Sequence, residues 1–342
     1  MGSESAIGSE PAIGSEPGTG ARRILFVAAN ASIDRLHEVD HLVPGGIHRP
    51  DMVLALPGGK GLNAARAALS LGADVAVVAI VGGRAGEWIA DRLAALGIPA
   101  TLIRAHAETR TCLSVLDRSD GSLTEFYEPG EPIAPEAWPE LEGAVAREIA
   151  RGEVGAVTVS GSLPPGAPVD GYARIVRMVV NAGIPVIVDA HGPALELAIA
   201  SGPTIVKVNA GEAAGAAGIA TENEGVEAAK ASPEDALRAA RSIVERGAGA
   251  AVVTLGVAGA IVVDPAGAWR LSGPTSRGRY PVGSGDAFLA GLAAGVTGGM
   301  DLVEAARHGM AAGFANAHAP GAGELDAAVA RTALAEIMSK RI

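Results

Sequence analysis

The sequence predicts an α/β fold in which helices cover both faces of a mostly parallel central sheet. The first basis is a series of short apolar runs that do not alternate with polar residues, as is typical of strands buried on both faces. These runs are residues 24–28, 75–81, 156–159, 186–188, 204–206, 251–254 and 261–263. The second basis is the presence, between many of the runs, of segments rich in Ala and Leu: residues 64–71, 87–96, 171–181 and 233–246. Alternation of strands with helices indicates parallel strands, whose ligands bind at the carboxyl ends.

Two segments depart from this pattern and predict a smaller sheet beside the main one. Residues 33–56 are polar and extended, whereas residues 113–116 and 123–126 alternate polar with apolar side chains. Residues 117–121 provide the turn of a hairpin that has one face in water. We interpret the smaller sheet, formed by about 33–57 and 108–130, as a lid over the main sheet. The alternative is an ordinary surface hairpin.

The N-terminal segment predicts no folded structure. Residues 6–11 and 12–17 repeat Ala-Ile-Gly-Ser-Glu-Pro. Because the segment lacks a basic start and a long apolar centre, it does not resemble a secretory signal. We expect a disordered tail over residues 1–21 without a catalytic part, followed by one folded domain over residues 22–342.

The composition excludes several classes of protein. The 342-residue chain has a net charge of −11, which argues against a general binder of nucleic acid or anionic membranes. Cys112 is the single cysteine, so an intrachain disulfide and a cysteine zinc site are excluded and a reducing cytoplasm fits. No run approaches ~18 uninterrupted apolar residues, so no membrane span is expected. The histidines are scattered, Gly-x-Ser-x-Gly is absent, and no predicted helix carries His-Glu-x-x-His.

The most informative stretch is residues 280–295, a glycine turn followed by an acid and an apolar helix. Gly283, Ser284 and Gly285 leave the backbone open, and a helix N-terminus attracts anions through its unpaired N–H groups. A carboxylate at an anion site, Asp286, fits a base that takes a proton from an attacking hydroxyl. This combination is what phosphoryl transfer requires. The alternative is that Asp286 merely caps the helix.

Residues 57–63, Pro-Gly-Gly-Lys-Gly-Leu-Asn, form a second glycine motif before a helix. Its bare glycines allow a ligand to touch the backbone, Lys60 offers a cation, and Asn63 offers a donor and an acceptor. The motif is not a Walker P-loop, because Gly61 stands where Ser or Thr should follow the lysine. The alternative is a strand-to-helix turn with a solvated lysine.

Other polar residues follow the predicted strands. Asp34 could accept bonds from two sugar hydroxyls, and Arg110 could bind a phosphate or carboxylate as a fork. Each could equally be an ordinary surface residue. Residues 207–212 combine Lys, Asn and Glu, which suits Mg²⁺ bound to phosphates through water, although Asn and Glu could simply cap a helix. The glycines of residues 254–260 suit a flat nucleotide, or a simple hairpin turn.

Together these motifs resemble the PfkB family of ribokinase-like sugar kinases. Residues 57–83 and 281–291 resemble its two signatures, residues 207–212 its Asn-x-x-Glu motif, and residues 253–256 its nucleotide loop. The match runs from about residue 24 to the C-terminus. It implies a ribokinase-like three-layer sandwich with a mostly parallel central sheet and a small β-sheet lid.

Within the family, the chain is most similar to the branch of 1-phosphofructokinase, 6-phosphofructokinase and tagatose-6-phosphate kinase. Residues 30–35, 43–49, 109–110, 124–130 and 160–166 carry this likeness. It implies ATP-dependent phosphorylation of a ketohexose phosphate, with Mg²⁺ as the metal. It also implies a homodimer joined through the lid, and from the composition we expect a cytoplasmic protein without nucleic-acid or membrane partners.

The resemblance assigns each site residue a role. Asp286 is the catalytic base, with Gly283, Ser284 and Gly285 as the anion hole. Sugar phosphate is expected at Asp34, Gly58, Gly59, Lys60, Asn63, Arg110 and Ser160. ATP is expected at Lys207, Asn209, Thr254, Gly256, Gly259 and Asn316. Asn209 and Glu212 are expected to hold Mg²⁺ through water.

Two residues depart from the family pattern, and two other functions stay open. Pro281 stands where many relatives have Thr or Asn, and Val208 where Pro is usual; neither change removes a catalytic group. One open alternative is a kinase of an unphosphorylated sugar or nucleoside. The other is a non-catalytic sugar or nucleotide sensor, against which the presence of Asp286, Lys207 and Glu212 together argues.

Overall fold

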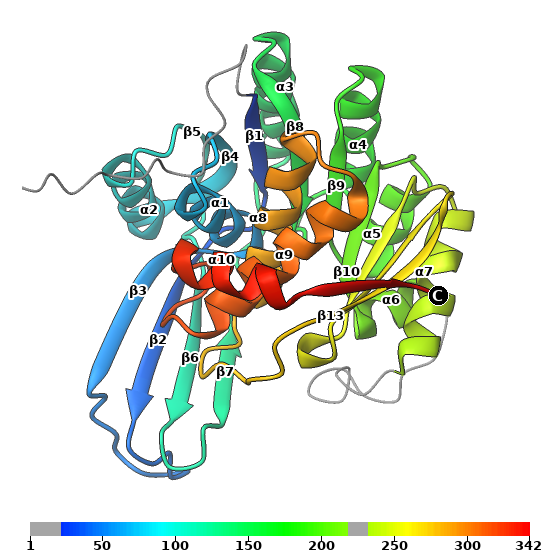
Figure 1. Ribbon diagram of the computed structural model, residues 1–342. Coiled ribbons are helices and arrows are strands. Elements are labelled where there is room, and N and C mark those ends of the chain that lie inside the picture. The colour runs from blue at the N-terminus through cyan, green and yellow to red at the C-terminus, as the bar shows by residue number, and fades with distance from the viewer. Residues whose placement is uncertain (1–21, 218–231) are drawn as a thin grey trace, which may run out of the picture.

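The computed structural model describes residues 22–217 and 232–342, so the predicted disordered tail over residues 1–21 lies outside the described residues. A ten-stranded sheet forms the centre (Figure 1). In sheet order its strands are β14 (Met338–Arg341), β13 (Gly267–Ser272), β12 (Ala260–Asp264), β11 (Ala251–Thr254), β10 (Ile205–Asn209), β9 (Val186–Asp189), β8 (Val154–Ser160), β1 (Arg23–Ala28), β4 (Val75–Gly82) and β5 (Ala100–Ala105). From β11 to β5 every neighbouring pair is parallel. The predicted mostly parallel sheet is therefore confirmed.

A second, four-stranded sheet extends away from the main body (Figure 1). Its strands, in order, are β3 (Met52–Gly58), β2 (Ser32–Val39), β6 (Thr111–Asp117) and β7 (Leu123–Tyr127). The predicted hairpin is the antiparallel pair of β6 and β7, and β2 lies parallel to β6. The smaller sheet predicted from the two unusual segments is present.

Helices cover both faces of the main sheet. They are α1 (Lys60–Ser70), α2 (Gly83–Ala95), α3 (Ala137–Ala150), α4 (Gly171–Asn181), α5 (Gly192–Ile199), α6 (Ala210–Ala216), α7 (Pro233–Glu245), α8 (Ser284–Thr297), α9 (Leu302–Ala317) and α10 (Ala327–Glu336). Leu25 and Val27 of β1 pack into the core under α3 to α7, whereas Ile24 and Phe26 pack into the core under α1, α2, α8 and α9. Successive side chains of one strand thus enter opposite cores, which explains why the runs are apolar throughout.

Several boundaries differ from the predicted ones. Helix α1 begins at Lys60 rather than residue 64, because Gly59 adopts φ 85° and starts the helix inside the glycine motif. Strand β10 continues to Asn209, so Lys207 lies within the strand rather than after it. The predicted run at 261–263 belongs to β12, which pairs antiparallel with β11. Residues 254–260 therefore connect two strands of a hairpin, which was the alternative prediction for this segment. None of the helices in the described ranges is long and apolar enough to cross a membrane.

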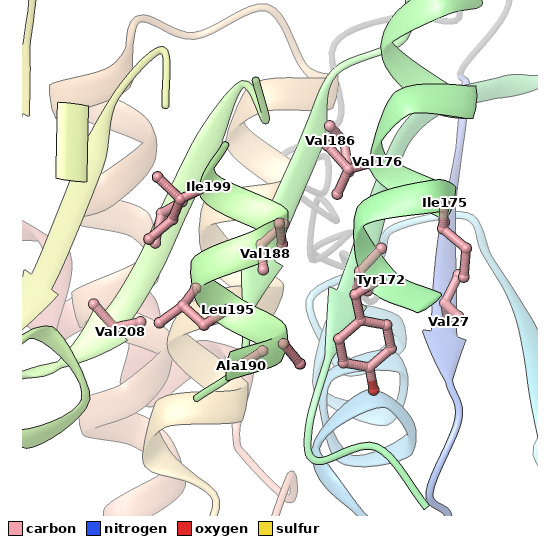
Figure 2. Packing of buried hydrophobic residues seen from close by; sticks show 14 of the residues in the cluster. Val27, Tyr172, Ile175, Val176, Val186, Val188, Ala190, Leu195, Ile199 and Val208 are labelled. Atoms are coloured by element: carbon pink, nitrogen blue, oxygen red, sulfur yellow. The ribbon is translucent and has the colours of Figure 1, made fainter. Parts of the chain in front are cut away.

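Figure 2 shows how the core under α4 and α5 is filled. Leu195 of α5 packs beside Val188 of β9 and Val208 of β10, and Tyr172 of α4 lies fully buried in the same cluster. The neighbouring Leu197, two residues along the same helix, is 39% exposed. Helix α5 therefore offers a matched pair of leucines that differ in burial.

We expect Leu195→Ala to lower the free energy of unfolding by about 2 to 5 kcal/mol, since it leaves a cavity in a close-packed core. Leu197→Ala serves as the control and should lower it by less than about 1 kcal/mol. Urea unfolding followed by circular dichroism measures both. Equal losses for the two variants would contradict the described packing of α5.

Candidate active site

A cavity of about 770 Å³ lies where the two sheets meet. One wall comes from the second sheet, including Asp34 of β2 and Cys112 of β6. The opposite wall comes from the carboxyl ends of the parallel strands, including Lys207 and Thr254, and from the start of α8. Ligands of parallel sheets bind at this edge, so the cavity lies where the fold predicts a site.

The glycine motif before α8 forms the floor of the cavity. Helix α8 begins at Ser284, and its N-cap Gly283 has a left-handed φ of 81° and no capping side chain. A Cβ atom at Gly283 would stand 2.5 Å from Cα of Ala322, so only glycine fits there. Asp286 does not cap the helix, which rules out the alternative prediction for this residue.

The first residues of the helix line the cavity. The N–H group of Ser284 donates to the carbonyl of Pro281 at 3.2 Å, and Nζ of Lys207 lies 3.1 Å from where a Cβ atom of Gly285 would stand.

Asp286 is 8% exposed in this floor. Its Oδ2 accepts a hydrogen bond of 3.0 Å from Nδ2 of Asn63. Burial raises the pKa of Asp286 to about 7, with Lys60 acting to lower it and Asp189 to raise it. A carboxyl group with a pKa near neutrality is suited to taking up and releasing a proton.

Asp34 lies on the other side of Asn63. Its Oδ2 accepts bonds from Nδ2 of Asn63 at 3.0 Å and from the backbone N–H of Gly59 at 3.3 Å, and its Oδ1 accepts one of 2.6 Å from Ser32. A Cβ atom at Gly58 would stand 2.0 Å from Cγ of Asp34. The glycine pair of the motif thus makes room for this carboxylate, and Gly58 lies behind the cavity wall.

Buried ion pairs lie at the end of the cavity where the sequence predicts the nucleotide. Asp189 is fully buried at the end of β9. It accepts hydrogen bonds of 2.8 Å from Nζ of Lys60 and of 2.5 Å from Nζ of Lys207. Burial alone would raise the pKa of Asp189, but the two lysines hold it below its usual value. Glu212 also accepts a bond from Lys60, at 2.9 Å. The sequence analysis missed Asp189, although an acid directly after an apolar run marks the end of a buried strand.

Asn209 and Glu212 cap helix α6 as a reciprocal pair. Oδ1 of Asn209 accepts from the N–H of Glu212 at 2.9 Å, and Oε2 of Glu212 accepts from the N–H of Asn209 at 2.9 Å. The capping role that was the alternative prediction is therefore present, and both residues also line the cavity. Over the described ranges, no cluster of three His, Cys, Asp or Glu residues could hold a metal ion.

Arg110 lines the cavity at the end of the second sheet. Its guanidinium donates to the carbonyl of Glu128 at 3.0 Å and to the carbonyl of Asn30 at 3.3 Å. Its Nε is buried and has no hydrogen-bond partner within residues 22–217 and 232–342. The carbonyls hold the group in place without neutralising its charge, which leaves it able to attract an anion.

The remaining predicted residues divide into two groups. Thr254 and Gly256 line the cavity beside Lys207. Gly259 turns toward β13, where a Cβ atom would stand 2.0 Å from the carbonyl oxygen of Leu271. Ser160 is 2% exposed and, like Gly259, lies outside the cavity lining.

Asn316 supports the glycine loop from behind. It is fully buried, and its Nδ2 donates to the carbonyl of Val282 at 2.9 Å. Its Oδ1 accepts from the N–H of Gly323 at 2.8 Å. Asn316 thereby joins the loop to the segment that packs against Gly283.

A further contact joins the glycine loop to the second sheet. The hydroxyl of Tyr280, three residues before Gly283, donates 2.7 Å to Oε1 of Glu38, a buried residue of β2. The two residues are 242 positions apart in the chain. This pair was not predicted: Tyr280 opens the stretch of residues 280–295, but neither it nor Glu38 was given a role.

Comparisons with known proteins show which family the chain resembles. The family model described as "pfkB family carbohydrate kinase" matches residues 24–328. A 1-phosphofructokinase of Rhodobacter capsulatus is 31% identical over 83% of this chain and 87% of its own length. The ATP-dependent 6-phosphofructokinase isozyme 2 of Escherichia coli is 31% identical over 86% of this chain and 92% of its own length. A tagatose-6-phosphate kinase of Staphylococcus epidermidis is 29% identical over 80% of this chain and 85% of its own length.

The fold has solved counterparts as well. The structure of the tetrameric inhibited form of phosphofructokinase-2 from Escherichia coli superimposes with a TM-score of 0.81. It is 28% identical and covers 92% of this chain and 98% of its own. Together with the family match, this likeness confirms the family resemblance and the fold class predicted from the sequence.

The raised pKa of Asp286 predicts a pH-dependent stability difference. In the unfolded chain this carboxyl ionises near 3.8, and in the fold near 7. The protonated carboxyl contributes stability that is fully present below the pKa of the unfolded chain. This stability is lost as the pH rises through the pKa of the folded protein. Asp286→Asn mimics the protonated form, so its stability relative to wild type should rise between pH about 4 and about 8, by more than about 1 kcal/mol.

Urea unfolding of both proteins across this pH range measures the difference. Asp91→Asn, at an exposed position of α2, is the matched control and should track the wild type. If the stability difference between Asp286→Asn and wild type were the same at every pH, the raised pKa would be wrong.

Proposed function

This chain belongs to the PfkB family of ATP-dependent carbohydrate kinases, and on that premise we propose that it phosphorylates a ketohexose phosphate to a bisphosphate. The candidate acceptors are fructose 6-phosphate, fructose 1-phosphate and tagatose 6-phosphate. The observation that carries the proposal is the position of Asp286, buried at the open N-terminus of α8 in the same cavity as Asp34 and Arg110.

The proposed reaction uses Asp286 as the base. Its carboxylate takes the proton of the sugar hydroxyl while the hydroxyl oxygen forms a bond to the γ-phosphorus of ATP. The bond from that phosphorus to the bridging oxygen breaks, and ADP carries away the electron pair. The backbone N–H groups of Gly283 and Gly285 are proposed to donate to the oxygens of the moving phosphoryl group, whereas the N–H group of Ser284 donates to the carbonyl of Pro281. Each such donor contributes ~10²–10³ in rate by analogy with oxyanion holes.

The sugar is proposed to bind at the second-sheet end of the cavity. Asp34 retains one lone pair, on Oδ1, for a sugar hydroxyl beside its bonds to Ser32, Asn63 and Gly59. Arg110, whose guanidinium donates to two backbone carbonyls, is proposed to bind the phosphate already on the sugar. This division of roles requires a substrate with hydroxyls at one end and a phosphate at the other.

The nucleotide is proposed to bind at the strand ends, against Lys207, Asn209, Thr254 and Gly256. Mg²⁺ would neutralise its phosphates. The donor set fits a metal held through water, because the oxygens of Asn209 and Glu212 already serve the cap of α6 and the contact with Lys60. Mg²⁺ characteristically keeps several of its waters, so two outer ligands and the substrate phosphates suffice.

The second sheet is proposed to act as a lid and to join two subunits. It supplies one wall of the cavity, including Leu54 of β3 and Tyr127 of β7. It also exposes large apolar side chains, with Val53 58% and Phe126 59% exposed. Burying these side chains in a homodimer would be favourable.

We expect Asp286→Asn to lower kcat by at least ~10²-fold while sugar and ATP still bind, because the amide cannot accept the proton. Steady-state assays of ADP formation measure kcat, and calorimetry measures binding. Asp91→Asn is the matched control with the same chemical change at an exposed site. A variant at residue 286 with a near-wild-type rate would remove this residue from the mechanism.

We expect Arg110→Ala to raise KM for the sugar phosphate at least ~10-fold and KM for ATP much less, because a charged hydrogen-bond partner of the substrate is lost. Arg104→Ala, on the exposed part of β5, is the control. The same assay run with a panel of sugars and sugar phosphates identifies the acceptor. Equal activity of the wild type on fructose and fructose 6-phosphate would contradict a phosphate-binding role, and no ATP consumption with any acceptor would favour a sensor.

A further inference from the structure

Arg66 is a buried arginine next to the proposed catalytic groups. It lies within the first signature, residues 57–83, but no role was predicted for it. It lies on α1 three residues after Asn63, so both side chains stand on the same face of the helix. Its residue exposure is 3%. A buried charge is unfavourable unless it is paired and hydrogen-bonded, so the partners of this guanidinium indicate what it does.

The guanidinium of Arg66 has four acceptors on three segments. Its Nε donates 3.0 Å to the carbonyl of Pro57 at the end of β3, and its Nη2 donates 2.8 Å to Oδ1 of Asn63. It also bonds to the carbonyl of Ala322 and to the carboxylate of Glu324. Ala322 is the residue against which Gly283 packs. Arg66 therefore joins α1, the second sheet and the support of the glycine loop.

The bond to Asn63 decides which way that side-chain amide points. A guanidinium only donates hydrogen bonds, and an ionised carboxylate only accepts them. Asn63 can satisfy Arg66, Asp34 and Asp286 together only when its oxygen faces the arginine and its nitrogen faces the two acids, as observed. The reversed amide would place its oxygen against two carboxylates and its NH₂ group against a cation.

We propose that Arg66 is a positioning residue that fixes the Asn63 amide and thereby holds Asp34 and Asp286 on one shared donor. The proposal rests on the proposed function, in which Asp34 binds the sugar and Asp286 is the base. Sharing a donor keeps the sugar-binding acid and the base at a constant separation. The hydroxyl that Asp286 deprotonates would otherwise reach it in more than one position.

The hydrogen bond from Asn63 also influences the pKa of Asp286. The charged groups around it are Lys60 of α1, Lys207 of β10 and Asp189 of β9, and Asp34 and Arg66 lie beyond Asn63. Burial raises the pKa of Asp286 to about 7, while the lysines and the bond from Asn63 lower it and Asp189 raises it. Loss of the amide donor disfavours the carboxylate and moves its ionisation to higher pH.

The test is the pH dependence of kcat/KM for the sugar phosphate in wild type, Arg66→Met and Glu324→Gln, measured from pH about 5 to about 9. We expect the acidic limb of Arg66→Met to lie about one pH unit higher than in wild type, with the activity recovering toward alkaline pH. Glu324→Gln removes the charge partner of Arg66 but keeps its bond to Asn63, so its limb should stay in place. A purely structural arginine would instead lower activity equally at every pH.

A second variant covers the case in which Arg66→Met does not fold. Asn63→Ala removes the shared donor and leaves the other three acceptors of Arg66 in place, so it should shift the acidic limb in the same direction. An unshifted limb in either folded variant overturns the proposal. Asp286→Asn tests the proposed function separately from the role of Arg66, because a near-wild-type rate in this variant would refute the proposed function. A large loss in Asp286→Asn together with an unshifted limb in Arg66→Met would refute only the role of Arg66.

Discussion

A single side-chain amide between two carboxylates is the contact on which the rest of the site depends. Asn63 on α1 joins Asp34 of the second sheet to Asp286 of α8 through one nitrogen. The nitrogen of this amide can face both acids while its oxygen faces a donor, and Arg66 supplies that donor. The glycines at positions 58 and 283 follow from the same arrangement, because any Cβ there would displace Asp34 or the support of the loop.

Charge is distributed in the cavity differently from the chain as a whole. The protein carries a net charge of −11, yet Lys60, Lys207 and Arg110 all line the cavity. Asp189 is buried between the two lysines and keeps them in place through ion pairs. Local cations thus allow an acidic protein to bind phosphorylated ligands, since charges on the far surface are screened by salt.

The sequence predicted the features that rest on local pattern and missed those that rest on tertiary pairing. Apolar runs predicted most of the parallel strands because both faces of that sheet are buried. Strand β14 has four exposed residues and pairs only with β13 at the sheet edge, so its pattern carries no signal. Asp189 carried a local signal, an acid directly after an apolar run, but its pairing with Lys60 joins residues distant in sequence, as does the bond from Arg66 to Ala322.

The hydrogen bond between Tyr280 and Glu38 has a mechanical consequence. Tyr280 precedes the glycine loop by three residues, whereas Glu38 lies toward the outer end of β2. A hinge-like rotation of β2 must therefore either drag the loop with it or break this bond. The position of β2, which lines one wall of the cavity, is thereby coupled to the position of the glycine loop, which forms its floor.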